Sequence, residues 1–158
     1  MTQELDKFDR KILSLLQSDC ALTVAQIARK AGLSTSPCWR RIGRLEEAGI
    51  IRRRVAVLDH TRLGMEVVVF VNVKLSQHGR ENLDNFASTI CTFPEVLECY
   101  SVTGDTDYLL KIVTRDIRHF EAFLRDHLMT MPMIRETHST IAVSEIKDTT
   151  ELPLETQL

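Results

Sequence analysis

The chain has 158 residues, of which 44% are hydrophobic and 27% charged, and its formal net charge is -2. These proportions are those of an ordinary globular protein and exclude collagen-like, fibrous and disordered classes. The longest apolar run, Val67 to Val71, is about a quarter of the roughly 20 residues that a membrane-spanning helix needs, so we expect no membrane partner. The N-terminus alternates charges instead of opening with the apolar stretch of a signal peptide, and the expected location is cytoplasmic.

The first two expected helices lie in the first thirty or so residues. Apolar residues recur at helical spacing from about Lys7 to Ser18, and Asp6 precedes them as a cap. A second helix begins after Thr23, because the side chains of Thr23 and Gln26 match a capping box. Gly32 ends that helix, since a residue without Cβ adopts the left-handed conformation cheaply.

A third helix follows a tight Gly32-Leu33-Ser34 turn. It is expected to start at Ser36 and Pro37, a cap followed by the residue best suited to the first helical position, and to close at Gly49. Ile50 to Leu58 then has the character of a basic extended strand. Together these elements predict a winged helix-turn-helix domain at residues 1–59.

The charge of the chain is unevenly distributed, which supports a nucleic-acid-binding role for this first part. Met1 to Leu63 contains twelve Lys or Arg against seven Asp or Glu, whereas the remainder contains eight against fifteen. Arginines suit both phosphates and the edge of guanine, and hydroxyls at the start of a helix suit a phosphate. The candidate DNA-binding residues are Ser34, Ser36, Trp39, Arg40, Arg41, Arg44, Arg52, Arg53 and Arg54.

Two of these assignments have structural alternatives. The arginines could instead form a solvated helix face paired with Glu46 and Glu47, a reading that the turn, the cap and the local positive charge disfavour. Trp39 could fill the seam between helices as readily as it could contact DNA.

After a turn-rich linker at residues 60–65, the apolar period changes from helical to alternating. The expected order in residues 66–143 is strand, helix, two strands joined as a hairpin, helix and strand. The elements are Val67–Leu75, a helix through Leu83 to Ile90, Val96–Val102, Tyr108–Val113, a helix from Ile117 to Leu128, and Ile134–Val143. This βαββαβ order predicts an α+β, ferredoxin-like domain with both helices on one face of an antiparallel sheet.

The other face of that sheet has no cover within the chain. We expect Val69, Val71 and Val73 to be available there and to favour self-association. The tail at residues 144–158 is polar, with Leu152, Pro153 and Leu154 as its apolar anchor, and could be loose or could pack on a neighbour.

Catalytic and metal chemistry find little support, so we expect neither an enzyme nor a bound cofactor. Nucleophile-elbow and phosphate-loop motifs are missing, and the histidines show no ligand spacing. The scattered cysteines also fit reduced thiols better than a zinc site or a disulfide framework. Those cysteines are Cys20, Cys38, Cys91 and Cys99.

Three stretches of the chain resemble the Lrp/AsnC, or feast/famine, family of transcription regulators. LDKFDRKILSLLQSD at Leu5 to Asp19 resembles the family's first helix, and GLSTSPCWRRIGRLEEAGII at Gly32 to Ile51 resembles its turn, recognition helix and wing entry. VTGDTDYLLKI at Val102 to Ile112 resembles its effector loop. The resemblance implies amino-acid-responsive regulation, dimers formed through the C-terminal domains and, commonly, octamers.

The loop after the second strand is the candidate effector site. Gly104 permits a turn whose amides suit an α-carboxylate, and Asp105 or Asp107 suits an α-ammonium, although hairpin-turn chemistry alone explains the same residues. The resemblance places the ligand between dimers, near this loop and the last strand. Thr140 stands where some relatives carry a larger aromatic residue, which leaves the effector open. The candidate effector-binding residues are Gly104, Asp105, Thr106, Asp107, Tyr108, Ser139, Thr140 and Ile141.

The leading hypothesis is therefore a homo-oligomeric regulator that binds double-stranded DNA and responds to a small-molecule amino acid. The alternative is an architectural DNA-binding protein that needs no effector. An enzyme on a ferredoxin-like scaffold and a metal-responsive regulator are the less favoured hypotheses.

Overall fold

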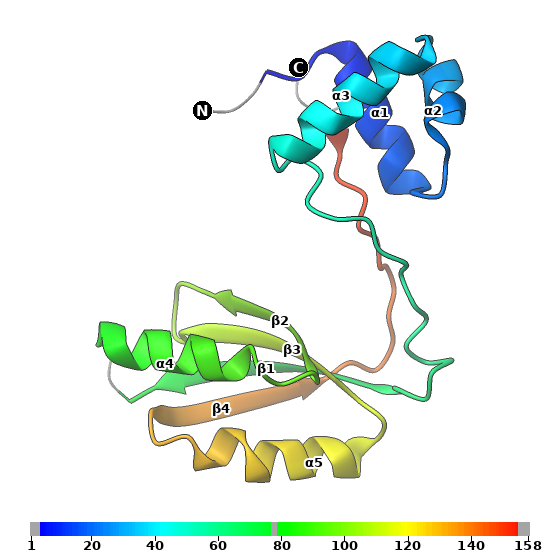
Figure 1. Ribbon diagram of the computed structural model, residues 1–158. Coiled ribbons are helices and arrows are strands. Elements are labelled where there is room, and N and C mark those ends of the chain that lie inside the picture. The colour runs from blue at the N-terminus through cyan, green and yellow to red at the C-terminus, as the bar shows by residue number, and fades with distance from the viewer. Residues whose placement is uncertain (1–3, 77–78, 155–158) are drawn as a thin grey trace. The chain divides into compact units, whose positions relative to one another are not determined.

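The computed structural model describes residues 4–76 and 79–154, which divide into two units (Figure 1). The first unit contains the residues up to Val57 together with the segment that begins at Lys147, and the second is Leu58–Ile146. In the described part of the chain, the helices are too short or too polar to cross a bilayer.

The first unit is built on three helices, α1 (Lys7–Ser18), α2 (Val24–Ala31) and α3 (Thr35–Glu47). Their inward side chains form one apolar core, and the helical spacing of these residues explains why they meet. The buried members are Ile12, Leu13, Leu16, Ile27, Ala28, Cys38, Ile42 and Leu45.

The predicted caps of α1 and α2 are confirmed. The Asp6 carboxylate accepts hydrogen bonds from the backbone amides of Phe8 and Asp9, at 2.8 and 2.9 Å. Thr23 and Gln26 form their capping box. Each cap satisfies amides that have no partner inside the helix, so the helix starts are fixed locally.

The predicted start of α3 is wrong by two residues. The helix begins at Thr35, with Ser34 as its N-cap, and Pro37 is the third helical residue. Proline is tolerated throughout the first turn, because the amides there have no helical acceptor, so its presence does not fix the first position. The predicted C-terminal turn is present, with Gly49 in the left-handed region at a φ of 69°.

The predicted basic strand after α3 is absent. Residues 52–59 belong to neither a helix nor a strand. A strand needs a neighbour to complete its hydrogen-bond ladder, and all the strands of the described chain belong to the second unit. The arginine-rich segment is therefore a wing without a sheet.

The C-terminal tail packs on the first unit. The Gln17 side chain makes two hydrogen bonds to the backbone of Leu152, at 2.9 and 3.0 Å, and the Ser18 hydroxyl donates to Glu151 at 2.9 Å. Leu154 packs against the apolar core of the helices. The tail is thus docked on α1 of its own chain and forms part of the unit that carries α3.

The second unit is a ferredoxin-like sheet with two helices. Its strands are antiparallel and lie in the order β2-β3-β1-β4. One continuous core joins the helices to the strands, so both helices cover the same face (Figure 1). The elements are β1 (Val67–Leu75), α4 (Arg80–Ile90), β2 (Val96–Ser101), β3 (Tyr108–Thr114), α5 (Ile117–Asp126), a 3-10 turn at Leu128–Thr130, and β4 (Ile134–Ile141).

The expectation that Val69, Val71 and Val73 line the open face is wrong. All three are 0% exposed and belong to the core under the helices. Alternation shows that these residues share a face, but only helix packing decides which face is covered. The open face carries the alternate residues of β1, among them Phe70, which is 38% exposed.

Candidate functional site

The outward surface of α3 is the candidate DNA-binding surface. Trp39 is 66% exposed, so it does not fill the helix seam. Arg40 beside it is also exposed. Pro37, Arg40, Arg41 and Arg44 line a shallow, open depression of about 300 Å³. The helix therefore presents an aromatic ring and cationic side chains together, a combination suited to a nucleic-acid surface.

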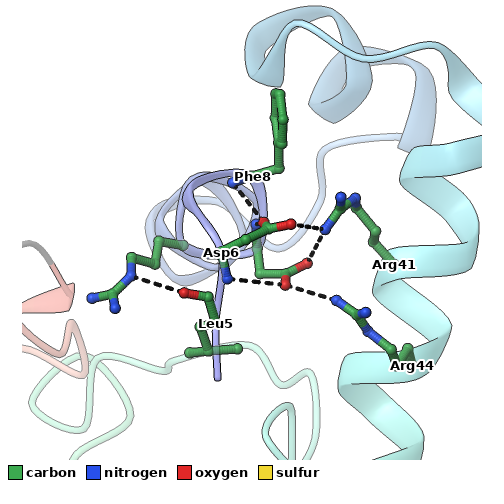
Figure 2. A network of polar contacts seen from close by, with 7 residues as sticks. Leu5, Asp6, Phe8, Arg41 and Arg44 are labelled. Atoms are coloured by element: carbon green, nitrogen blue, oxygen red, sulfur yellow. Dashed lines mark hydrogen bonds and ion pairs between the residues drawn. The ribbon is translucent and has the colours of Figure 1, made fainter. Parts of the chain in front are cut away.

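Two of the predicted DNA-binding arginines are held by acidic residues of α1. The Nη1 atom of Arg41 donates to the carboxylates of both Asp6 and Asp9, at 2.7 and 2.8 Å. The Nη2 atom of Arg44 donates to Asp9 at 2.7 Å. Figure 2 shows Arg41 reaching from α3 to Asp6, with the Arg44 side chain extending toward α1 beside it. Asp9 is 1% exposed, so its charge is neutralised by the arginines rather than by water.

The network also changes the protonation of its members. The Asp9 amide, with help from the Arg41 guanidinium, lowers the pKa of the Asp6 carboxyl below its usual value. Hydrogen bonds to Asp9 and Asp6 raise the pKa of Arg41. The charged forms of both partners are therefore favoured in the folded unit.

Sequence reasoning assigned the arginines to the right helix but missed Asp6 and Asp9 as their partners. It considered only Glu46 and Glu47, which lie on α3 itself. Asp6 and Asp9 were visible as the cap and the third residue of the first helix. What was missing was the crossing of the two helices, which brings together residues that lie 32 or 35 positions apart in the sequence.

The remaining predicted residues lie on the surface. Ser34 and Ser36 are exposed at the start of α3. Arg54 pairs with Glu46 at 2.7 Å, with both side chains partly exposed. The described residues provide no ion-pair partner for the remaining predicted arginines, which are Arg40, Arg52 and Arg53.

The predicted effector loop is fastened to the sheet at Asp107. Its carboxylate accepts from the Leu75 amide at 2.7 Å, and its own amide donates to the Val73 carbonyl at 2.9 Å. Gly104 has a φ of 119°, which favours glycine, and Asp105 is exposed. Asp107 therefore closes the hairpin, whereas Asp105 presents a carboxylate to solvent.

Tyr108 points away from the loop surface. Its side chain is buried, its ring lies 4.6 Å from that of Phe86, and its hydroxyl donates to the Leu83 carbonyl at 3.3 Å. Burial raises the pKa of Tyr108. The ring belongs to the core, so Tyr108 can serve a ligand only through its backbone.

A single chain keeps the two halves of the predicted effector site apart. Tyr108 pairs with Val73 of β1, whereas Ser139 and Ile141 of β4 pair with Val71 and Val69 on the opposite edge of β1. Two strand spacings of roughly 5 Å each separate β3 from β4. The loop and the end of β4 thus reach one ligand only if a further element or a second copy brings them together.

Across residues 4–76 and 79–154, no group of three or more His, Cys, Asp or Glu side chains has an arrangement that could hold a metal ion. The cysteines are unpaired, and burial raises the pKa of the Cys38 and Cys99 thiols.

Comparison with protein families finds matches for both units. Residues 5–52 match the winged helix-turn-helix DNA-binding model, and residues 68–152 match the Lrp/AsnC ligand binding domain. The DNA-binding transcriptional activator DecR of Escherichia coli K12 is 37% identical over 151 residues, which cover 96% of this chain and 99% of the relative.

Two solved structures share the fold over almost the whole chain. An AsnC family transcriptional regulator from Agrobacterium tumefaciens is 47% identical and has a TM-score of 0.92, with 98% of this chain and 100% of the other covered. A transcriptional regulator from Neisseria meningitidis in complex with L-Met is 37% identical and has a TM-score of 0.93, with the same coverage. The family resemblance and the α+β fold class expected from the sequence are confirmed.

Proposed function

Because the chain belongs to the Lrp/AsnC family of transcriptional regulators, we propose that α3 reads its operator and that an amino acid is its effector. The chain is a DNA-binding transcriptional regulator with an effector-binding domain. Its relatives are regulators of transcription and not enzymes. An effector-independent architectural role is not favoured, since a relative binds L-Met. A protein that reads chromosomal DNA acts where that DNA lies, which for bacterial relatives is the cytoplasm.

The observation that carries the DNA proposal is the exposure of Trp39 and Arg40 on one helix of the first unit. Arg40 is unpaired among the described residues, so it can meet a phosphate or a guanine edge without losing an internal contact. Arg52 and Arg53 on the wing are suited to the neighbouring phosphate backbone. Ser34 and Ser36 are placed to donate to a phosphate at the start of α3.

A selected duplex tests this proposal. The wild-type protein would first be used to enrich a site from a randomised 30-bp duplex pool. We expect Arg40→Ala to weaken binding to that duplex by roughly 5- to 150-fold, which corresponds to about 1–3 kcal/mol for a specific arginine contact. Arg118→Ala, which removes an equal and exposed charge from α5, is the control and should leave the affinity within about twofold. An unchanged affinity for Arg40→Ala would remove α3 as the reading helix.

For the effector, the loop at Gly104 to Asp107 and the Ser139–Ile141 end of β4 are the proposed contacts. Support comes from the exposed Asp105 carboxylate, which suits an ammonium, and from the ligand-binding family match. Because one chain keeps these segments on different strands, the site is proposed to form between copies of the chain.

A thermal-shift screen with the twenty amino acids tests the effector. A ligand that binds only the folded protein raises the melting temperature. We expect one amino acid or a related group to give a shift that Asp105→Asn removes and that Asp126→Asn, an exposed carboxylate on α5, preserves. No shift with any amino acid would contradict the proposal.

The open sheet face is the proposed dimer surface, in a homo-oligomer that extends to an octamer. It carries Phe70 and Tyr100, which are 38% and 54% exposed, on a face that neither helix covers. Light scattering should show a mass reduced by Phe70→Glu and unchanged by Met129→Glu, which alters a 70% exposed side chain of the 3-10 turn.

A further inference from the structure

The buried Asp9 carboxylate joins α1 to the helix proposed to read DNA. Asp9 is the only charged side chain among the buried described residues. Its Oδ1 accepts from Arg41, and its Oδ2 accepts from Arg44 and from the Asp6 amide. Each oxygen therefore has at least one donor from the protein, and the carboxylate has little remaining contact with water.

The two arginines differ in how much of each side chain stays accessible once the contact with the carboxylates is made. The Arg41 side chain is 25% exposed and is held by two carboxylates, whereas the Arg44 side chain is 49% exposed and is held by Asp9 alone. Arg44 donates to Asp9 through Nη2, so its other guanidinium donors stay open to a ligand. Arg44 also lies one helical turn after Arg40, on the same face of α3 and beside the same depression.

An arginine held at one end has lost much of its side-chain freedom before any ligand arrives. Ordering a free, rotamer-rich side chain at an interface costs conformational entropy. Because of the contact with Asp9, the side chain of Arg44 loses this entropy when the protein folds and not when DNA binds. The contact also orients the planar guanidinium in one direction. Pre-ordering of this kind favours one binding geometry over others, which is the requirement for reading base edges.

The charge balance of the cluster points the same way. Two carboxylates, Asp6 and Asp9, neutralise the two guanidinium groups that they contact, so the cluster adds little net positive charge to α3. Non-specific affinity for DNA depends on net neutralisation of phosphates. A cluster that contributes little to non-specific affinity and holds an arginine in one orientation is suited to selecting one DNA sequence over others.

We propose that Asp9 is a positioning residue that orients Arg44 for sequence-specific DNA contact, with Arg41 as an internal strut that does not contact DNA. This inference rests on the proposed function of α3. Asp6 is the helix cap that helps to hold Arg41, and it does not touch Arg44.

The test compares specific with non-specific affinity for the same variants. The specific probe is the duplex enriched by the wild-type protein, and the non-specific probe is a scrambled duplex of equal length. Asp9→Asn keeps the size of the side chain but removes its charge and one acceptor. We expect the ratio of specific to non-specific affinity to fall about tenfold, with non-specific affinity unchanged or raised, because the freed guanidinium groups become available to any phosphate.

Asp6→Asn is the matched control. Asparagine caps a helix as well as aspartate does, and the change removes an equal charge from the same network without touching Arg44. Its affinity ratio should stay within about twofold of wild type. A purely structural role for Asp9 predicts that both affinities fall together, and simple repulsion of DNA by its charge predicts that both rise together. Either result, with an unchanged ratio, overturns the proposal.

A second pair of variants serves if Asp9→Asn does not fold. Arg44→Gln changes a half-exposed side chain and should lower the ratio about tenfold, whereas Arg41→Gln should preserve it, since Asp9 still holds Arg44. Equal loss in both variants contradicts the division of roles. If the wild-type protein enriches no sequence at all, the proposed function fails together with this inference, whereas an enriched sequence with an insensitive ratio overturns the inference alone.

Discussion

The two units of the chain are each stabilised internally by a different kind of contact. In the first, short helices share a small apolar core, and α1 is also joined to α3 through the buried carboxylate of Asp9. In the second, a larger apolar core lies between a sheet and two helices, and its ion pairs, such as Lys111 with Glu98, lie at partly exposed positions. The described residues of the second unit bury no charged side chain.

This difference shows how size governs the use of charge. A small unit buries a smaller fraction of its surface, so each additional contact between its helices contributes a larger share of its stability. The first unit uses arginines for that purpose, although DNA binding also needs them. The second unit has enough apolar area to dispense with buried charge, and its polar loop and open sheet face remain available for a ligand and a partner.

The largest effect is expected in the apolar core of the second unit. Phe86 is 0% exposed and packs against Tyr108. Phe86→Ala should lower the free energy of unfolding of this unit by about 3–5 kcal/mol, through lost burial and the cavity left behind. Hydrogen exchange measured separately on peptides from the two units should show the loss in the second. Met129→Ala, at a 70% exposed side chain, is the control and should have little effect.

A change at Asp9 should give a smaller loss, confined to the first unit. Asp9→Ala removes charge-assisted hydrogen bonds to Arg41 and Arg44, both of which retain some access to water. We expect the free energy of unfolding to fall by about 2–3 kcal/mol. Urea unfolding, monitored by hydrogen exchange in α1 and α3, measures this loss of free energy. A loss below that of Asp6→Ala would show that the apolar core alone holds the helices.

The docked tail should contribute less again. A chain that ends at Ile146 lacks the contacts of Leu152 with Gln17, of Glu151 with Ser18, and the packing of Leu154. We expect the first unit to lose about 1–2 kcal/mol, since these contacts are partly exposed. A chain that ends at Leu154 is the matched control. Equal stability of the two truncated chains would mean that the tail does not support the helices.

Acid sensitivity is the smallest expected difference. The pKa of Asp6 is lowered in the folded unit, so its stabilising effect is complete above its unfolded pKa and is lost as pH falls through the folded value. Asp116, the cap of α5, has its pKa lowered by the His119 amide and side chain, so the second unit responds in the same direction.

The variant Asp6→Asn distinguishes the acid response of the first unit from that of the second. Chemical unfolding at pH values from 6 down to 3 should show a shallower decline for the first unit of Asp6→Asn than for wild type, with the second unit unchanged. An identical decline in both proteins would show that Asp6 is not linked to folding of the first unit.

Local patterns in the sequence predicted most of the elements. The bounds of the first helix and of the first strand, Lys7–Ser18 and Val67–Leu75, agree with the structure because caps and periodicity act within a few residues. Apart from the start of α3, the errors occurred where a distant partner decides the outcome. Residues 52–59 lack a strand to pair with, and Val69 lies under the helices and not on the open face.

The candidate sites divide in the same way. Exposure of Arg40 follows from its position on the polar side of a helix, which the sequence shows. The hydrogen bonds of Arg41 and Arg44 to Asp9 cannot be seen in the sequence, because they depend on how two helices cross. Likewise, the turn at Gly104 is visible in the sequence, whereas the inward direction of Tyr108 is set by packing against α4.

The sequence by itself determined the order of helices and strands, the charge difference between the two parts and the family resemblance. These depend on short-range periodicity, capping and composition. The tertiary structure alone decided which face of the sheet is covered, where the tail docks and which arginines are already engaged. Each of these is a contact between segments far apart in the chain, and its energy depends on three-dimensional proximity that no local pattern encodes.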